Sequence, residues 1–237
     1  MSHDLRVILW DIDGTLLHSR RHGAFKEYMA PAMVRVFGTA GRLDEMVVSG
    51  MTDLQIFTEA LDAEGFTAEQ VRGRLPELVA SFLEGMERLA AAGELFRALP
   101  GARAALEALG REPRYLNSLL TGNVEPAARL KLRLAGLDDF FRLPGAFGDL
   151  SHDRRDLPAV ARERIGRHLG VDIRPDQLVV IGDTPNDIAC ARHFGARAVA
   201  VATGRSHSAA DLLSHSPDAL LPDLADTELL LRTLAVL

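Results

Sequence analysis

Two aspartates, Asp11 and Asp13, directly follow the apolar run Val-Ile-Leu-Trp at residues 7–10. Such a run is typical of a buried parallel strand, and open α/β sheets bind ligands at the carboxyl ends of their strands. Two carboxylates that converge there repel each other, which raises the pKa of one of them and favours a neutralising cation. The pair therefore suits a metal-assisted nucleophile with a neighbouring acid or base.

A second polar motif, Thr121-Gly122-Asn123, ends another apolar run. A hydroxyl followed by glycine and the start of a helix offers a side-chain donor and backbone N–H groups to an anion. Pro126 suits the first turn of the helix that would follow. Alone, the triplet is common in turns, so its position at a strand end carries the prediction of an anion site.

A third motif places Asp183 and Asp187 after the apolar run at residues 178–181, in the pattern Gly-Asp-x-x-x-Asp. Oxygen ligands around an open site suit Mg²⁺, which binds through few carboxylates and keeps several waters. The same pattern alone also fits a capped turn from strand to helix. Three acidic or hydroxyl motifs in order, each at an expected strand end, favour the metal interpretation.

The cations that would accompany an anion are nearly all arginines. Of the 27 basic residues only Lys26 and Lys131 are lysines, so we expect Lys131 to mark a place where a compact ammonium matters. A solvated helix face is the alternative for Lys131. Arg154 and Arg155 lie shortly before the Asp183 motif and are the other candidates.

Apolar, β-rich runs alternate with helix-length segments, which indicates a parallel sheet built of βα units. The expected strands are residues 7–10, 115–120, 178–181, 198–201 and 219–221. Between residues 18 and 98 we expect no strand, because apolar residues there recur at helical spacing. Thr67 and Gln70 are placed for a capping box, and Pro76 is expected to kink or restart the last of these helices.

Composition is that of an ordinary globular enzyme, with 47% hydrophobic and 25% charged residues. The formal net charge of −6 gives no footprint for nucleic acid or an anionic membrane. No apolar run approaches ~20 residues, and the chain enters its first expected strand at once, so we expect no membrane span and no signal peptide. Cys190 is the single cysteine, which favours the cytoplasm and a buried, inert thiol.

Taken in order, Asp11-x-Asp13-Gly-Thr, the Thr121 motif and the Asp183 motif resemble the haloacid dehalogenase (HAD) superfamily, most of all phosphoglycolate phosphatase-like hydrolases. The resemblance covers nearly the whole chain. It implies an α/β fold with a Rossmann-like parallel sheet core and an inserted helical C1 cap. We expect the core at residues 1–17 and 99–237 and the cap at residues 18–98.

The resemblance also implies roles for the polar residues. Asp11 would be the nucleophile that forms an aspartyl-phosphate, Asp13 the acid and base, and Thr121 a ligand of the phosphoryl group. Mg²⁺ would be held by Asp11, Asp13 and Asp183, with Asp187 acting indirectly or through a water. The phosphoryl group would be bound by Thr121, Gly122, Asn123, Lys131 and Arg154.

One motif departs from the commonest family pattern. Many C1-capped relatives carry a lysine in Lys-Pro-x-Pro shortly before the last acidic motif, whereas this chain has Arg154 and Arg155 there. We expect Lys131 to contact the phosphoryl group and Asp11, with Arg154 as a contributor. An arginine would bind phosphate oxygens as a fork, and a lysine as a point charge.

Specificity is expected in the cap loop that contains Gly50, Thr52 and Asp53. Gly50 permits a tight turn, and Thr52 or Asp53 would contact the leaving group; an N-cap role for Thr52 is an equal alternative. His18, Arg20 and Arg21 could face the cleft or form a solvated hinge. The loop at residues 205–207 is a candidate on the phosphate side.

The preferred function is a Mg²⁺-dependent phosphatase for a small phosphorylated metabolite. Asp13 argues against a dehalogenase, and the cap offers no suitably placed lysine for phosphonatase-like chemistry. A sugar phosphomutase would share every core motif and stays open. So does a non-catalytic HAD protein that binds a phosphate ligand, although Asp11, Asp13 and Asp183 are all present. The oligomeric state is left open.

Overall fold

In the computed structural model, which describes residues 5–20 and 22–237, five parallel strands form one sheet. The strand order is β4-β1-β5-β6-β7. The sheet strands are β1 (Arg6–Trp10), β4 (Tyr115–Leu119), β5 (Leu178–Gly182), β6 (Arg197–Val201) and β7 (Ala219–Leu221). All five expected strands and the α/β fold class are confirmed.

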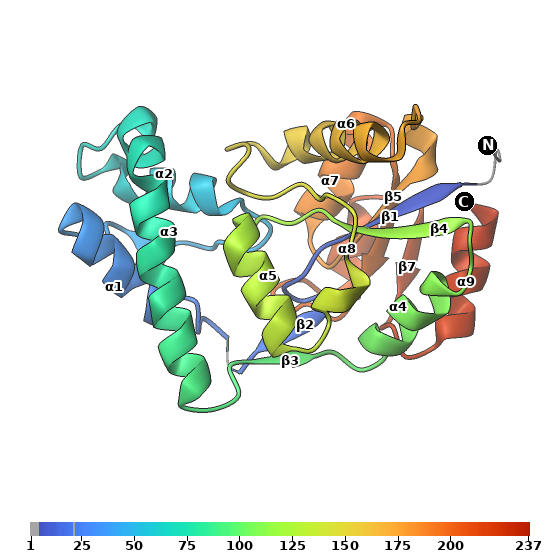
Figure 1. Cartoon of the computed structure of the whole chain (residues 1–237), viewed down its shortest axis with the longest axis horizontal. Helices are drawn as coiled ribbons and strands as arrows, with labels where there is room; N and C mark the ends of the chain where they lie inside the picture. The colour runs from blue at the N-terminus through green and yellow to red at the C-terminus, as the bar shows by residue number, and fades with distance from the viewer. Residues whose placement is uncertain (1–4, 21) are drawn as a thin grey trace.

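The sheet is buried on both faces because successive side chains of a strand point to opposite sides. In β1, Ile8 and Trp10 join one hydrophobic core, and Val7 and Leu9 join the other. Figure 1 shows the helices as layers on both sides of the sheet. The first core contains α4 (Ala102–Gly110), α5 (Glu125–Leu134) and α9 (Thr227–Val236), and the second α6 (Leu157–Leu169), α7 (Pro185–Phe194) and α8 (Ala209–Ser214).

Three helices, α1 (Lys26–Phe37), α2 (Asp53–Asp62) and α3 (Ala68–Ala91), form a separate group at one end of the molecule (Figure 1). They pack through apolar stripes in which the Phe82 ring lies 6.2 Å from Tyr28 and 6.0 Å from Phe57, between ring centroids. This group lies within the segment expected to be the cap. The exact division of the chain into core and cap stays a prediction.

The expectation that this segment contains no strand is wrong. A second, two-stranded antiparallel sheet is formed by β2 (Leu17–Ser19) and β3 (Phe96–Ala98), where no strand was expected. Each strand has three residues, too few to show an alternating pattern. In addition, α3 does not restart at Pro76 but continues through it as one helix, while a kink there stays a prediction. Pro76 and Arg72, whose carbonyl loses its helical partner, are both exposed, so water can satisfy that carbonyl.

Local capping follows the sequence closely. Thr67 and Gln70 form the expected capping box at the start of α3, and Pro126 lies in the first turn of α5.

Cys190 is buried, as expected. Among the described residues no helix is both long enough and apolar enough to cross a membrane. The cytoplasmic location stays a prediction.

Candidate active site

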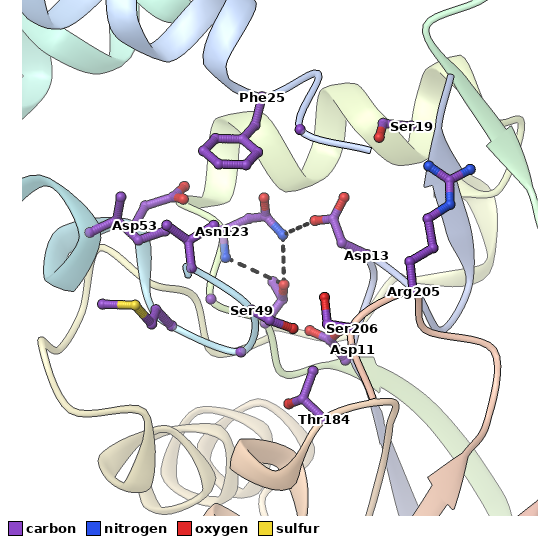
Figure 2. A pocket seen from close by; sticks show the side chains of 18 of the residues that line it. Asp11, Asp13, Ser19, Phe25, Ser49, Asp53, Asn123, Thr184, Arg205 and Ser206 are labelled. Carbon is purple, nitrogen blue, oxygen red and sulfur yellow. Dashed lines mark hydrogen bonds between the residues drawn. The ribbon is translucent and has the colours of Figure 1, made fainter. Parts of the chain in front are cut away.

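The three central strands of the sheet bring the polar motifs to one place. Trp10 is in register with Leu119 of β4 and with Ile181 of β5, so the residues that follow each strand meet at the same edge. The Asp11 N–H donates to the Ile181 carbonyl at 2.9 Å, which continues the sheet one residue further. A cavity of about 560 Å³ opens at this edge, between the sheet and α1 and α2 (Figure 2).

Three carboxylates cluster at the sheet edge, and two of them, Asp11 and Asp183, line the cavity. Asp11, Asp183 and Asp187 are buried, and each offers an oxygen within 4.8 Å of the others. The Thr15 hydroxyl donates to Asp183 at 3.0 Å, and the Thr184 hydroxyl donates to Asp187 at 2.7 Å. These bonds fix two of the carboxylates before any ligand binds.

Two glycines leave room for the Asp183 carboxylate. A Cβ added to Gly14 would lie 2.3 Å from Asp183 Oδ2, and one added to Gly204 would lie 2.0 Å from it. Gly14 also has a φ of +91°, which side chains rarely adopt. Backbone from two separate loops can therefore approach this carboxylate only because both positions are glycine.

Arg154 is the cation that reaches the acidic cluster. Its Nη2 donates to Asp11 Oδ1 at 2.9 Å and also to Asp187, while its Nη1 donates to the Gly50 carbonyl at 3.1 Å. The Arg154 side chain is 6% exposed, and its Nε is buried without a hydrogen-bond partner. Arg155, by contrast, is exposed and pairs with Asp153.

Burial controls the electrostatics of this cluster. It raises the pKa of Asp11 to about 7, against the opposing effect of Arg154 and with further increases from Asp187 and Asp13. Burial and the neighbouring Asp11 and Asp187 also raise the pKa of Asp183 well above its usual range. One guanidinium cannot neutralise three ionised carboxylates, which is why, beyond the effect of burial, these pKa values rise. Hard oxygen ligands that lack counter-charge fit a divalent cation such as Mg²⁺.

A second network surrounds Asp13, whose side chain is 43% exposed to the cavity. Lys131 Nζ donates to Asp13 Oδ2 and to Asn123 Oδ1, both at 2.6 Å. Asn123 Nδ2 donates to the same Asp13 oxygen and to Thr121 Oγ1, both at 2.8 Å (Figure 2). Burial opposes the charge of Lys131, but Asp13, Tyr28 and Asp53 together raise the pKa of its ammonium above the ordinary value.

The contact with Asp11 that was expected of Lys131 is made by Arg154 instead. Lys131 contacts Asp13, and Arg154 is the residue that contacts Asp11. Lys131 belongs to α5, which follows β4 and reaches the side of the cavity where Asp13 lies. Arg154 begins a short 3-10 turn, Arg154–Asp156, that packs against α7 and approaches Asp11 from the Asp187 side.

Thr121 and Gly122 line the cavity as expected. Thr121 Oγ1 accepts hydrogen bonds from the backbone and side-chain nitrogens of Asn123, at 3.3 and 2.8 Å. Its own hydrogen is therefore available to an anion. Gly122 is in close contact with the cap loop, since a Cβ there would lie 2.0 Å from the Met51 carbonyl.

The three expected specificity residues have different positions. Gly50 and Asp53 line the cavity, whereas Thr52 is fully buried and does not line it. Thr52 is the N-cap of α2, accepting from the Gln55 N–H at 3.1 Å. Asp53 accepts from the Val124 N–H at 2.8 Å, and burial raises its pKa to about 6.

Two further polar residues face the mouth of the cavity. His18 and Arg205 both line it, and Figure 2 shows the Arg205 guanidinium beside Ser19. His18 Nε2 is buried without a hydrogen-bond partner, and burial and Arg205 lower its pKa. Arg20 does not line the cavity, and Arg21 lies outside the described residues. The sequence analysis did not single out Thr15 or Tyr28, although Thr15 is part of the first motif.

The chain is similar to known proteins over nearly its full length. A family model described as HAD-hydrolase-like matches residues 155–227. A phosphoglycolate phosphatase of Vibrio vulnificus (strain YJ016) is 22% identical over 225 residues, covering 94% of each chain. A solved structure of a predicted phosphoglycolate phosphatase from Haemophilus somnus 129PT superposes with a TM-score of 0.64, 20% identity, and coverage of 98% and 100%. A hydrolase from Pseudomonas syringae gives a TM-score of 0.63, 23% identity, and coverage of 96% and 98%.

Proposed function

We propose that this chain, a phosphoglycolate phosphatase-like member of the HAD superfamily, hydrolyses small phosphomonoesters with the help of Mg²⁺ and through a phosphorylated Asp11. The observation that carries the proposal is the meeting of two networks in one cavity. The buried carboxylates Asp11 and Asp183, with Asp187 close to them, form one network, and Asp13 with Lys131 forms the other. One network holds a nucleophile, and the other holds a positioned acid and base.

Asp11 is the nucleophile of this proposal. Its carboxylate attacks phosphorus in line, which splits the hydrolysis into two easier steps with an aspartyl-phosphate between them. Arg154 donates to one oxygen, Asp11 Oδ1, and so orients the carboxylate. The Thr121 hydroxyl and the backbone N–H of Gly122 bind the phosphoryl oxygens as negative charge spreads over them.

Asp13 transfers the protons. Protonated, it gives its proton to the leaving-group oxygen as the bond to phosphorus breaks. As a carboxylate, it then takes a proton from the water that hydrolyses the aspartyl-phosphate. Lys131 and Asn123 both donate to Asp13 Oδ2, which fixes the rotamer and leaves Oδ1 for this work.

The proposed metal would be held by Asp11, Asp183 and the backbone carbonyl of Asp13, with Asp187 behind them. When bound, Mg²⁺ supplies positive charge to the transferring phosphoryl group and to the buried carboxylates. Arg154 already neutralises part of that cluster, and its contact to Asp187 ties the second acid of the Asp183 motif to Asp11.

Phosphate release from a panel of phosphomonoesters tests the function. The panel contains phosphoglycolate, hexose phosphates and nucleoside monophosphates, each with Mg²⁺ or with EDTA. We expect release that needs Mg²⁺ and is abolished in Asp11→Asn. No release from any ester by folded protein that binds Mg²⁺ would contradict the proposal in favour of a phosphomutase or a binding protein.

A further inference from the structure

The cavity is larger than the smallest substrates of a phosphatase require. Its volume is about 560 Å³, within the range of roughly 300–1,000 Å³ that holds drug-sized ligands. Phosphoglycolate has nine non-hydrogen atoms. Even at ~30 Å³ for each, the volume of a water molecule in the liquid, it would fill only about half of the space. The remaining volume is available to a larger leaving group.

Part of the lining of this space is an apolar wall. It is built by three aromatic residues and by three of the six methionines of the chain. Methionine side chains are flexible and polarisable, so they adapt to apolar ligands of different shape. We define the apolar wall as Phe25, Tyr28, Met29, Met46, Met51 and Phe96.

The wall lies where a leaving group would extend. Figure 2 shows Phe25 across the cavity from Asp11 and Thr184, with Asn123 and Asp53 between them. A phosphoryl group bound at Asp11 therefore has its ester oxygen near Asp13 and its organic part directed toward α1. Phe25 is half-buried, so part of its ring is free to contact a ligand.

Two of the charged side chains beside the wall are engaged elsewhere, and Arg205, which also lines the cavity, lies on the side of Asp13 (Figure 2). Lys26 Nζ donates to the Asp44 carbonyl at 2.7 Å, and Asp53 accepts from the Val124 N–H at 2.8 Å. A sugar would bring several hydroxyl groups, and each one that loses water without gaining a partner costs binding free energy. Apart from the Tyr28 hydroxyl, the side chains of the wall offer a polyhydroxylated group no strong hydrogen-bond partner.

Resting on the proposed phosphatase function, we infer that the preferred substrates are phosphomonoesters whose leaving group is a long aliphatic or aromatic alcohol. A hexose phosphate or a two-carbon acid would bind the same phosphoryl site and leave the wall unfilled. The wall thus selects by buried apolar area, mainly at its half-buried members Phe25, Met46 and Met51, because the other three are already buried.

A homologous series tests this inference. Ethyl, butyl and hexyl phosphate differ in length but have nearly equal leaving-group acidity, so differences in kcat/KM report binding of the chain. Each buried methylene is expected to raise kcat/KM about two- to fourfold, which gives hexyl phosphate at least about a tenfold advantage over ethyl phosphate. Hexyl phosphate should also exceed phosphoglycolate and glucose 6-phosphate. A flat series, or a preference for either of those two, would overturn the inference and leave the phosphatase function intact.

Binding gives a readout that does not depend on turnover. Calorimetric titration with ethylphosphonate and hexylphosphonate should show the same preference for the longer chain. If no phosphate is released from any ester but hexylphosphonate binds more tightly than ethylphosphonate, the phosphatase function is contradicted. The binding role of the apolar wall would still be supported. Equal affinity for the two phosphonates would refute the wall.

Matched variants locate the effect. Phe25→Ser removes one ring of the wall at the residue that precedes α1, where Phe25 makes no side-chain cap, so no cap is lost. We expect Phe25→Ser to reduce the advantage of hexyl over ethyl phosphate about threefold or more. Val34→Ser removes an apolar side chain that is 51% exposed and outside the cavity lining, on the same helix, and should leave the advantage unchanged.

Discussion

At the scale of single residues, the two cations of the site contact different carboxylates, although either cation could bind a phosphate. Arg154 forks between Asp11, Asp187 and the Gly50 carbonyl, and a planar guanidinium suits several fixed acceptors. Lys131 contacts the single oxygen Asp13 Oδ2 and the Asn123 amide oxygen, which suits a compact ammonium. Arg154 therefore contacts the proposed nucleophile, Asp11, and Lys131 contacts the proposed acid and base, Asp13.

The contact of Lys131 with Asp13 predicts a dependence on the leaving group. In Lys131→Met the Asp13 carboxyl loses its strongest donor, so proton transfer to an alkoxide becomes inefficient. We expect kcat for an alkyl phosphate to fall on the order of 100-fold. For p-nitrophenyl phosphate, whose leaving group needs no proton, kcat should fall less than about threefold. Equal losses for both esters would show that Lys131 binds the phosphoryl group instead.

The ion pairs of Arg154 predict that the stability lost on its substitution depends on the metal. Arg154→Met leaves the acids Asp11 and Asp187 buried without their cation, which costs about 3 kcal/mol of unfolding free energy in EDTA. Mg²⁺ should recover part of this loss, because a bound cation neutralises the same carboxylates. Urea unfolding with Mg²⁺ and with EDTA measures both values.

Arg155→Met is the control, since Arg155 forms an exposed pair with Asp153 and should change stability by less than about 0.5 kcal/mol. An equal loss for Arg154→Met with and without Mg²⁺ would argue against a metal at the cluster.

At the scale of elements, the loop before α2 joins the helical group to the sheet edge. The Asp53 N–H donates to the Gly122 carbonyl at 2.6 Å, and Gly50 contacts Thr184 and Asn186 closely. The same loop supplies the Gly50 carbonyl to Arg154. Its conformation therefore affects both packing and the geometry at Asp11.

Two glycines have similar positive φ angles, but only one of them has close neighbours. Substituting each by alanine therefore separates the effect of backbone strain from that of a close contact. Gly50 has a φ of +73°, and a Cβ there would lie 2.7 Å from Thr184 Oγ1; Gly65 has a φ of +84° with nothing within 4 Å. We expect Gly65→Ala to cost about 1 kcal/mol of stability with little change in kcat/KM. Gly50→Ala should cost more and lower kcat/KM at least about tenfold. Equal effects of both substitutions on kcat/KM would show that the contact at Gly50 does not shape the site.

Asp53 predicts a pH dependence of stability. Burial raises its pKa from 3.8 to about 6, so between these values the folded protein binds more protons than the unfolded chain. Its contribution to the unfolding free energy therefore decreases as pH rises from 4 to 6 and is constant above about 7. Asp53→Asn keeps an oxygen for the Val124 N–H and removes the titration.

Urea unfolding of both proteins at a series of pH values checks this. The stability of Asp53→Asn relative to the wild type should increase by about 1–3 kcal/mol from pH 4 to pH 7. A difference that stays constant over this range would show that Asp53 titrates normally.

At the scale of the whole molecule, the strands and the polar motifs were predictable because a buried parallel strand requires a continuous apolar run. The runs that end at Asp11, Thr121 and Asp183 all proved to be neighbouring strands of one sheet. The pair β2 and β3 was not predictable, since each strand has only three residues. The partner of each cation was also not predictable, because it depends on the side from which α5 and the turn at Arg154 approach the sheet edge.

Which apolar residues line the cavity was also not predictable from the sequence pattern. Met29 and Phe25 belong to an apolar helical stripe that reads as core, and the structure places them on the cavity lining. Helical spacing shows which residues share a face of α1. It does not show that this face is divided between packing and an open space.

The central claim is that Asp11 becomes phosphorylated. The most direct measurement is rapid quenching of the reaction, reduction with borohydride, and peptide mass analysis, which converts an acyl phosphate of aspartate to homoserine. With p-nitrophenyl phosphate, whose leaving group needs no proton, we predict this conversion at Asp11, with greater yield in Asp13→Asn, where hydrolysis of the intermediate is slowed. Continued phosphate release with an unmodified Asp11 in both proteins would contradict the account.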